Sequence, residues 1–158
     1  MRISHKVDYG VRVMTALAEI ERETPGVPTT SAALAARGEF PPGFLEDVLR
    51  QLRTAGLLRG VRGGGGGWLL TRPAASITVA DVIRAVDGPL ASVRGVRPHE
   101  LADAGEREPF VSLWVAVRAA LRSVLEHVTL ADMAGGSLPP AVQVLVDDDA
   151  WATRLLRG

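Results

Sequence analysis

The chain has 158 residues, a formal net charge of +0 and no cysteine. Without thiols it has no disulfide, no thiolate metal site and no thiol redox sensor. Hydrophobic residues make up 47% and aromatic residues only 4%, and a core of aliphatic side chains and alanine favours helices over a β-sandwich. No apolar run approaches the ~18 residues of a membrane span. The N-terminus has no apolar signal-peptide core, so we expect a cytoplasmic protein without a membrane partner.

The two halves of the chain differ slightly in charge. Residues 1–72 contain 10 Lys and Arg against 7 Asp and Glu, whereas residues 73–158 contain 8 against 11. A weakly basic front and an acidic rear are consistent with a DNA-binding part joined to a second module. The asymmetry is mild and decides little by itself.

The front half opens with two predicted helices. Apolar residues recur at three- and four-residue steps from Val7 to Ala18, which predicts a first helix with Ser4 as its N-cap. The pattern ends at a Pro-Gly turn. A short second helix follows over residues 31–37, and Gly38 is its stop.

A third helix is predicted over residues 42–55, with Gly56 as its C-cap. One face is apolar and comprises Phe44, Leu45, Val48, Leu49 and Leu52. The other face is polar and comprises Asp47, Arg50, Gln51 and Thr54, with Glu46 and Arg53 beside it. This amphipathic pattern leaves the polar face free to meet a ligand.

A β-hairpin is predicted after the third helix. Two short apolar runs, residues 57–61 and 68–71, flank Arg62 and a run of five glycines at 63–67. A fourth helix then begins at Thr78 and ends at an Asp-Gly-Pro turn.

The rear half contains one long predicted helix. Residues 90–109 have no clean period and are predicted to form a loop, and residues 110–128 form a helix whose apolar band is wider than one packing partner needs. We therefore expect this band to be buried between two subunits. Its candidate dimerisation residues are Trp114, Val117, Leu121 and Val124. One more helical turn is expected at 129–133, and the tail from Leu138 has no clear assignment.

Three helices followed by a hairpin with a glycine tip are the element order of a winged helix. A helix fits the roughly 12 Å major groove of DNA, where its polar face meets base edges. The hairpin tip lies along the DNA backbone, and Arg62 at its base reaches phosphate or the minor groove. The candidate DNA-binding residues are Gly43, Asp47, Arg50, Gln51, Arg53, Arg62, Gly63, Gly64 and Gly65.

Each of these features also has a plainer interpretation. Arg50 and Gln51 either read guanine and adenine, respectively, or belong to a solvated helix face. Asp47 either orients an arginine or accepts a hydrogen bond from cytosine. The glycine run is alternatively a flexible linker; a nucleotide-binding loop is disfavoured because no Gly-Lys-Ser/Thr follows.

Several segments resemble the Rrf-two family of regulators, which includes the iron–sulfur regulators IscR and NsrR. The resemblance covers about residues 1–134, and the glycine-rich phrase at 61–70 with its spacing after Gly56-Leu57 is the specific part. The other similar segments are residues 1–4, 8–10, 44–46, 52–57, 77–83 and 86–88. The resemblance implies a homodimer in which the helix at 110–128 packs against its mate.

The resemblance also implies a division of the chain and a sensor. Residues 1–88 correspond to the winged helix domain, 89–134 to a sensor-position loop with the dimerisation helix, and 135–158 to a tail. Relatives commonly bind an iron–sulfur cluster through cysteines in that loop, and some supply a carboxylate at the position of Asp8. Because the thiolates are missing here, we expect no cluster, no cofactor and no metal.

We therefore expect a mainly α protein with a small β-hairpin, a dimeric transcriptional regulator that binds double-stranded DNA at a partly palindromic operator. No catalytic triad or carboxylate pair rises above chance, so we expect no enzyme. The alternatives are a small-molecule-binding or protein-interaction module that kept the fold without DNA binding. An unidentified small-molecule effector stays open. His99-Glu100 either binds a metal or ligand or has a structural role, and Trp114 and Trp151 either line a ligand pocket or pack in the core or the dimer contact.

Overall fold

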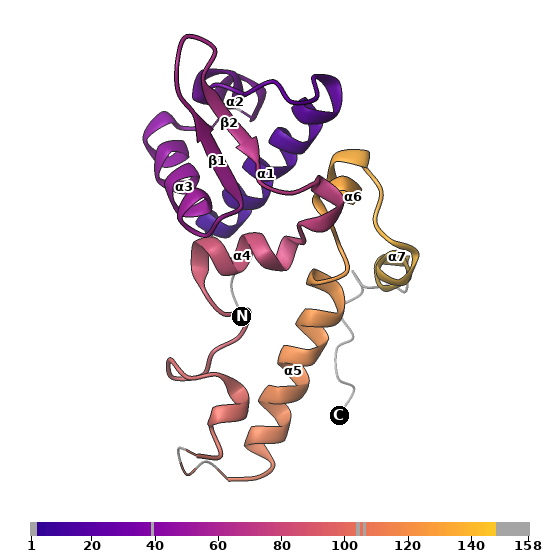
Figure 1. Ribbon diagram of the computed structural model, residues 1–158. Coiled ribbons are helices and arrows are strands. Elements are labelled where there is room, and N and C mark those ends of the chain that lie inside the picture. The colour runs from indigo at the N-terminus through magenta and orange to yellow at the C-terminus, as the bar shows by residue number, and fades with distance from the viewer. Residues whose placement is uncertain (1–2, 39, 104, 106, 148–158) are drawn as a thin grey trace.

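The computed structural model describes residues 3–38, 40–103, 105 and 107–147 (Figure 1). Three helices and a hairpin form one end of the molecule, and a long helix extends away from them toward the other end. The helices are α1 (His5–Glu23), α2 (Ser31–Gly38), α3 (Pro42–Thr54), α4 (Val79–Asp87), α5 (Phe110–Leu125), α6 (Leu130–Gly135) and α7 (Pro140–Asp147). The strands are β1 (Leu58–Val61) and β2 (Gly67–Leu70), and the 3-10 turns are η1 (Ala74–Ser76) and η2 (Pro98–Glu100).

Local capping signals place the ends of α1 and α3 as the sequence predicts. Val7 N–H donates to Ser4 Oγ at 3.2 Å, which caps the start of α1. At the end of α3, Gly56 has a φ of +76°, and Leu57 N–H donates to Leu52 carbonyl at 2.9 Å. Together with the bond from Gly56 N–H to Arg53 carbonyl, this is a Schellman motif, which needs a left-handed residue at that point.

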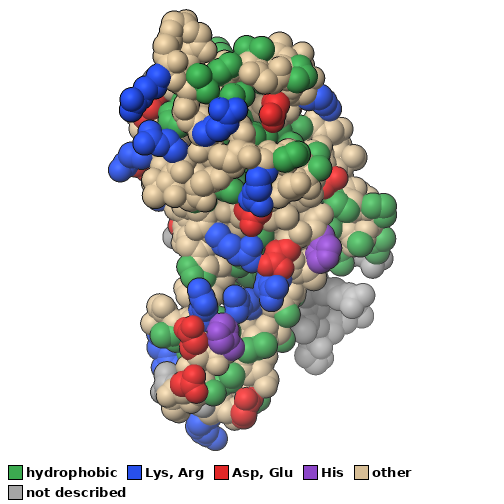
Figure 2. Space-filling view, viewed as in Figure 1, with side chains coloured by type: hydrophobic (Ala, Val, Ile, Leu, Met, Phe, Trp, Pro, Cys, Tyr) green, Lys and Arg blue, Asp and Glu red, His purple; other side chains and the backbone are tan. Residues whose placement is uncertain are grey.

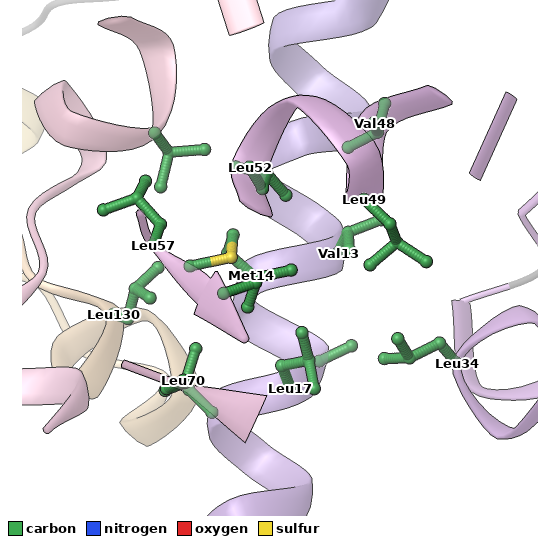
Figure 3. Packing of buried hydrophobic residues seen from close by; sticks show 14 of the residues in the cluster. Val13, Met14, Leu17, Leu34, Val48, Leu49, Leu52, Leu57, Leu70 and Leu130 are labelled. Atoms are coloured by element: carbon green, nitrogen blue, oxygen red, sulfur yellow. The ribbon is translucent and has the colours of Figure 1, made fainter. Parts of the chain in front are cut away.

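The three front helices bury one continuous aliphatic core (Figure 3). On α3 the side chains of Leu45, Leu49 and Leu52 are 2%, 0% and 0% exposed, and they pack with Met14 and Leu17 of α1. Each such side chain contributes about 1.5–3 kcal/mol when it is removed from water. With its inner face held in the core, α3 leaves its polar face on the surface.

The hairpin is anchored at its base by a segment that the sequence did not reveal. β1 and β2 pair antiparallel, with Gly60 opposite Trp68. Thr29 forms an isolated bridge with Trp68 through two backbone bonds of 3.0 and 2.8 Å. Trp68 Nε1 also donates to Ser31 Oγ at 3.1 Å. The base of the wing is therefore tied to the start of α2.

A backbone bridge joins α4 to α6 at their first residues, where each helix has a capping box. Thr78 and Asp81 cap α4, and Thr129 and Asp132 cap α6 in the same way. The two cap residues form an antiparallel bridge, through Val79 N–H to Val128 carbonyl and Leu130 N–H to Ile77 carbonyl, both at 2.9 Å. This bridge fixes the end of α5 against the winged helix.

The bridge also explains where the rear half differs from the prediction. The helix expected to reach residue 128 ends at Leu125, because Val128 has to leave the helix to pair with Val79. The expected helical turn is α6, and α7 forms where no element was assigned. Val142 of α7 packs with Val79 and Val128 in a second, smaller cluster.

The described residues between positions 90 and 109 are largely irregular, as expected, apart from η2 and a bridge between Val93 and Val96. Trp151, together with the rest of the tail beyond residue 147, lies outside the described residues. In the described ranges, no helix combines the length and hydropathy that a bilayer crossing requires. The domain limits at residues 88 and 134 stay a prediction.

The close approach at the wing base yields a stability prediction. A Cβ atom at Gly67 would lie 2.4 Å from the carbonyl oxygen of Thr29, so Gly67→Ala must separate the bridge from the hairpin. We expect a loss of about 1–3 kcal/mol in the free energy of unfolding, measured by urea denaturation. Gly64→Ala at the open tip, where no atom lies within 4 Å of the added Cβ, is the matched control. Equal losses of unfolding free energy in Gly67→Ala and Gly64→Ala would show that the close contact with Thr29 does not stabilise the wing.

A second prediction concerns the carboxylate that joins α5 to α4. Glu126 accepts hydrogen bonds from Arg122 Nε, at 2.9 Å, and from Arg84. These bonds lower the pKa of Glu126 to about 2 from its usual value of 4.5, and the bond from Arg122 has the larger effect. A carboxyl group with a lowered pKa in the folded state stabilises the fold above its unfolded pKa and loses that contribution as the pH falls toward 2.

The difference in unfolding free energy between the wild type and Glu126→Gln should therefore be largest above about pH 4.5. It should shrink as the pH is lowered through 4 and 3. Denaturant titrations at several pH values measure it, with Glu108→Gln as a control carboxylate that lies outside this contact. A difference that stays constant across this range would show that the ion pairs contribute nothing.

Candidate nucleic-acid interface

The exposed face of α3 carries the side chains expected to meet DNA bases. Arg50 is widely open, with 74% of its side chain exposed. Gly43, Glu46 and Arg53 are exposed beside it, and Gln51 is half-buried. This face lies next to the hairpin at the same end of the molecule (Figure 1).

Asp47 holds both predicted base-reading side chains. Its carboxylate accepts a hydrogen bond from Arg50 Nη2 through one oxygen and from Gln51 Nε2, at 2.6 Å, through the other. One of the two roles considered for Asp47, orienting an arginine, therefore matches the geometry. A guanidinium has five donors, so Arg50 keeps free N–H groups for a base edge. Gln51 keeps only one, which makes Arg50 the better placed of the two.

The wing begins at Arg62, directly after β1, and its tip is a glycine turn. Gly66 N–H donates to Gly63 carbonyl at 2.9 Å, and Gly63 has a φ of +113°, which favours glycine. Gly64 and Gly65 are exposed at the tip. With no side chains there, backbone N–H groups can approach a phosphate closely.

Two adjoining hollows connect α3 to the wing, and both are lined by Arg53 and Trp68. The first also contains Glu46, Asp47 and Arg50. We call the second the wing hollow; its charged lining residues are Arg53, Arg59 and Arg62. No acidic side chain is among the described residues that line the wing hollow.

The structure brings the predicted DNA-binding residues of α3 and the wing onto one surface, with basic side chains spread over this end of the molecule (Figure 2). Arg59 was missed because its strand was interpreted as an apolar run. A signal was present: Arg59 follows Leu58, which is buried, and alternation along a strand places such neighbours on opposite faces. Arg59 faces the hollow between Arg53 and Arg62.

The predicted dimerisation helix exposes much of its apolar surface. Trp114 is 37% exposed, and Val117, Leu121 and Val124 are half-buried. Val124 also contacts the second hydrophobic cluster. Other large apolar side chains of α5 are more open and comprise Phe110 at 50%, Leu113 at 52% and Val115 at 40%.

The loop before α5 holds His99 against an arginine. His99 Nδ1 lies 3.0 Å from Arg118 Nη1, and its Nε2 lies 3.8 Å from Glu100 Oε1. Across the part of the chain that the structure describes, no three His, Cys, Asp or Glu side chains group as metal ligands. Asp8 instead pairs with Arg12 at 2.8 Å.

Comparison with known proteins shows the family to which the chain belongs. A model of the Rrf2 family, described as an iron-dependent transcriptional regulator, matches residues 3–136. The chain is 48% identical over 148 residues to an HTH-type transcriptional regulator of Mycobacterium tuberculosis, covering 94% of this chain and 90% of that protein. It is 35% identical over 134 residues to the HTH-type transcriptional regulator CymR of Bacillus subtilis, covering 85% and 90%.

Solved structures show the same fold. CymR of B. subtilis, described as its global cysteine regulator, aligns with a TM-score of 0.70 and 31% identity over 87% of this chain and 98% of that one. IscR of T. potens aligns with a TM-score of 0.66 and 29% identity over 100% and 94%. The winged helix fold and the resemblance noted in the sequence are confirmed: the chain belongs to the Rrf2 family of transcriptional regulators.

Proposed function

We propose that this regulator is a cytoplasmic homodimer that binds a partly palindromic DNA operator without an iron–sulfur cluster and catalyses no reaction. The observation that carries the proposal is the arginine surface formed by α3 and the wing. Arg50 is free to meet a guanine edge in the major groove. Arg53, Arg59 and Arg62 line a hollow with no carboxylate among its described lining residues, which suits the phosphate backbone.

The residues of this surface have different proposed roles, according to the groups that surround them. Asp47 orients Arg50 and fixes its position before DNA arrives, so that less side-chain entropy is lost on binding. The glycine tip, with Gly63, Gly64 and Gly65, runs along the backbone. Arg62 contacts phosphate or the minor groove and binds any sequence, whereas Arg50 discriminates between sequences.

The exposed apolar side of α5 supports the homodimer. Phe110, Leu113 and Trp114 are 50%, 52% and 37% exposed on one helix, and a patch of this kind marks an interaction surface in a soluble protein. A second copy of α5 supplies a matching apolar face by symmetry. Trp114, Val117, Leu121 and Val124 form the proposed contact.

Iron–sulfur independence follows from a test of the residues against the family's described iron dependence. Iron–sulfur clusters are held mainly by cysteine thiolates, and this chain contains no cysteine. His99 and Asp8, the positions that could add ligands, are engaged with Arg118 and Arg12. The residues present therefore do not fit a cluster, and the proposed DNA binding does not pass through one.

Two arginine variants test the DNA-binding surface. Arg62→Ala should weaken binding to operator and scrambled DNA alike and should reduce the salt slope by about one unit per lost phosphate contact. Arg50→Ala should mainly reduce discrimination, by roughly 1–3 kcal/mol for each bidentate contact. In a symmetric dimer both half-sites lose the contact, so the total can double. Binding isotherms at several salt concentrations, on iron-free protein, measure both effects.

Arg12→Ala on α1 is the control, because Arg12 lies outside both hollows that join α3 to the wing. Unchanged operator affinity in both Arg50→Ala and Arg62→Ala would show that the DNA surface is placed wrongly. The DNA tested should include the stretch beside the protein's own gene. If the wild type binds no DNA at all, a small-molecule-binding or protein-interaction module is favoured instead.

A third variant tests the dimer. Leu121→Asp places a charge in the proposed contact and should give monomers or insoluble protein, because an unpaired charge is costly in an apolar interface. Ser123→Asp adds the same charge to an exposed position of the same helix and should leave the dimer intact. Light scattering at micromolar concentration measures the mass. A stable wild-type monomer would refute the dimer.

A further inference from the structure

A second hollow lined by arginines lies between the winged helix and α5. We call it the waist hollow; it has a volume of about 250 Å³ and is lined by Arg84, Gly88, Pro89, Leu90, Arg97 and Arg118. Figure 2 shows basic side chains gathered in the middle of the visible face, below the end that carries α3 and the wing. The three arginines come from α4, from the loop and from α5, so only the folded chain brings them together.

The waist hollow has no acidic side chain among its described lining residues. The hollow between α1 and α2, in contrast, contains Asp8 and Glu19 beside its arginines. Three guanidinium groups around a space without a carboxylate repel one another, and an anion in that space relieves the repulsion. Their planar forks bind carboxylate or phosphate oxygens in pairs.

The contacts of the three arginines leave donors available. Arg84 is shared with Asp81, at 3.6 Å, and with Glu126, both outside the lining. Arg118 meets the imidazole of His99, which carries no negative charge. The Arg97 side chain is exposed, and among the described residues the carboxylate beside it, Glu100, accepts from the backbone N–H of Arg97 at 3.0 Å and lies near His99, with no ion pair to the Arg97 guanidinium. The positive charge is therefore only partly compensated, and Arg97 is the group freest to close on a ligand.

The waist hollow adjoins the proposed dimer contact along α5. Arg118 follows Val111 by seven residues, two helical turns, and so shares its face of α5. Val111 is 8% exposed, so this face packs inside the subunit. Trp114 and Leu121 of the proposed dimer contact stand four residues before and three residues after Arg118, so they border the side of α5 that faces the hollow.

We propose that the waist hollow binds a small anion with two or more negative charges, a phosphate ester or a dicarboxylate, and that this anion is an effector of the regulator. The volume lies just below the ~300–1,000 Å³ of sites for drug-sized ligands, so it suits a small metabolite. A bound anion links α4, which packs on α1 and α3 of the winged helix, to α5. The effect of this anion on DNA binding rests on the proposed function, but the binding of the anion to the waist hollow does not.

Thermal unfolding tests the site with sodium phosphate and sodium succinate as probes, against sodium chloride at equal ionic strength. A ligand that binds only the folded state raises the Tm, and the rise grows with the logarithm of the ligand concentration once this exceeds the Kd. The larger rise identifies phosphate or carboxylate as the preferred chemistry. Arg97→Ala and Arg118→Ala should each weaken binding about tenfold or more, the loss expected for a hydrogen bond to a charged group. Arg97→Lys should weaken it less.

Two controls separate this site from other basic surfaces. Arg107→Ala removes an exposed arginine of the same loop that does not line the hollow, and it should keep the full Tm rise. Arg62→Ala should keep it as well, although it is expected to lose DNA affinity. A rise that is equal in every variant, or one that disappears in Arg62→Ala, would overturn the site.

Operator affinity tests the effector role. The preferred anion should change the operator Kd of the wild type by about fivefold or more, relative to Arg97→Ala in the same buffer, where the change should be lost. Binding at the waist with no difference between these two proteins would refute the effector role. If the wild type binds no DNA while the Tm rise persists, the proposed function fails and the anion site stands.

Discussion

The backbone bridge between Thr78 and Thr129 is the contact on which the arrangement of the two halves depends. Each residue caps a helix with its side chain, and the flanking backbone groups pair at 2.9 Å. Because both strands of the bridge are also helix starts, α4 and α6 cannot shift independently. The bridge ends α5 at Leu125 and sets its direction relative to the winged helix.

The arginines differ in whether a carboxylate lies beside them. Arg37 forms a two-pronged pair with Glu23 and a bond to Glu19, which clamps α2 to α1 and lowers the pKa of Glu23. Glu126 is shared by Arg84 and Arg122. In contrast, the wing hollow and the waist hollow have no acidic lining residue among those described. Zero net charge is thus compatible with the proposed anion binding, because the described lining of these two hollows is basic.

Asp47 is a negatively charged residue on the face of α3 that we propose contacts DNA. It lies on α3 among the groups proposed to meet DNA, where a carboxylate alone would repel phosphate. Its two oxygens bind Arg50 and Gln51, so the charge is neutralised locally and the guanidinium is oriented. The cost is that Arg50 has fewer donors left, which restricts the base edges it can match.

Much of the front half was predictable because its signals are local. Ser4, the apolar steps of α1, the two faces of α3 and the Schellman glycine Gly56 each act within about one or two helical turns. The glycine run likewise predicted the wing, and the lack of cysteine argued against a cluster. These features depend on neighbours in the chain, so they can be recognised before the fold is known.

The rest depends on residues that meet only in the folded chain. Thr29 anchors Trp68 across more than thirty positions, and it carries no local sign of doing so. Helix periodicity continues through residue 128, yet the bridge from Val79 ends α5 at Leu125. Arg84, Arg97 and Arg118 are unremarkable where each stands in the sequence, and they line one hollow because α4, the loop and α5 converge. Local propensity thus determined the elements, and tertiary packing decided where they end and which charges they bring together.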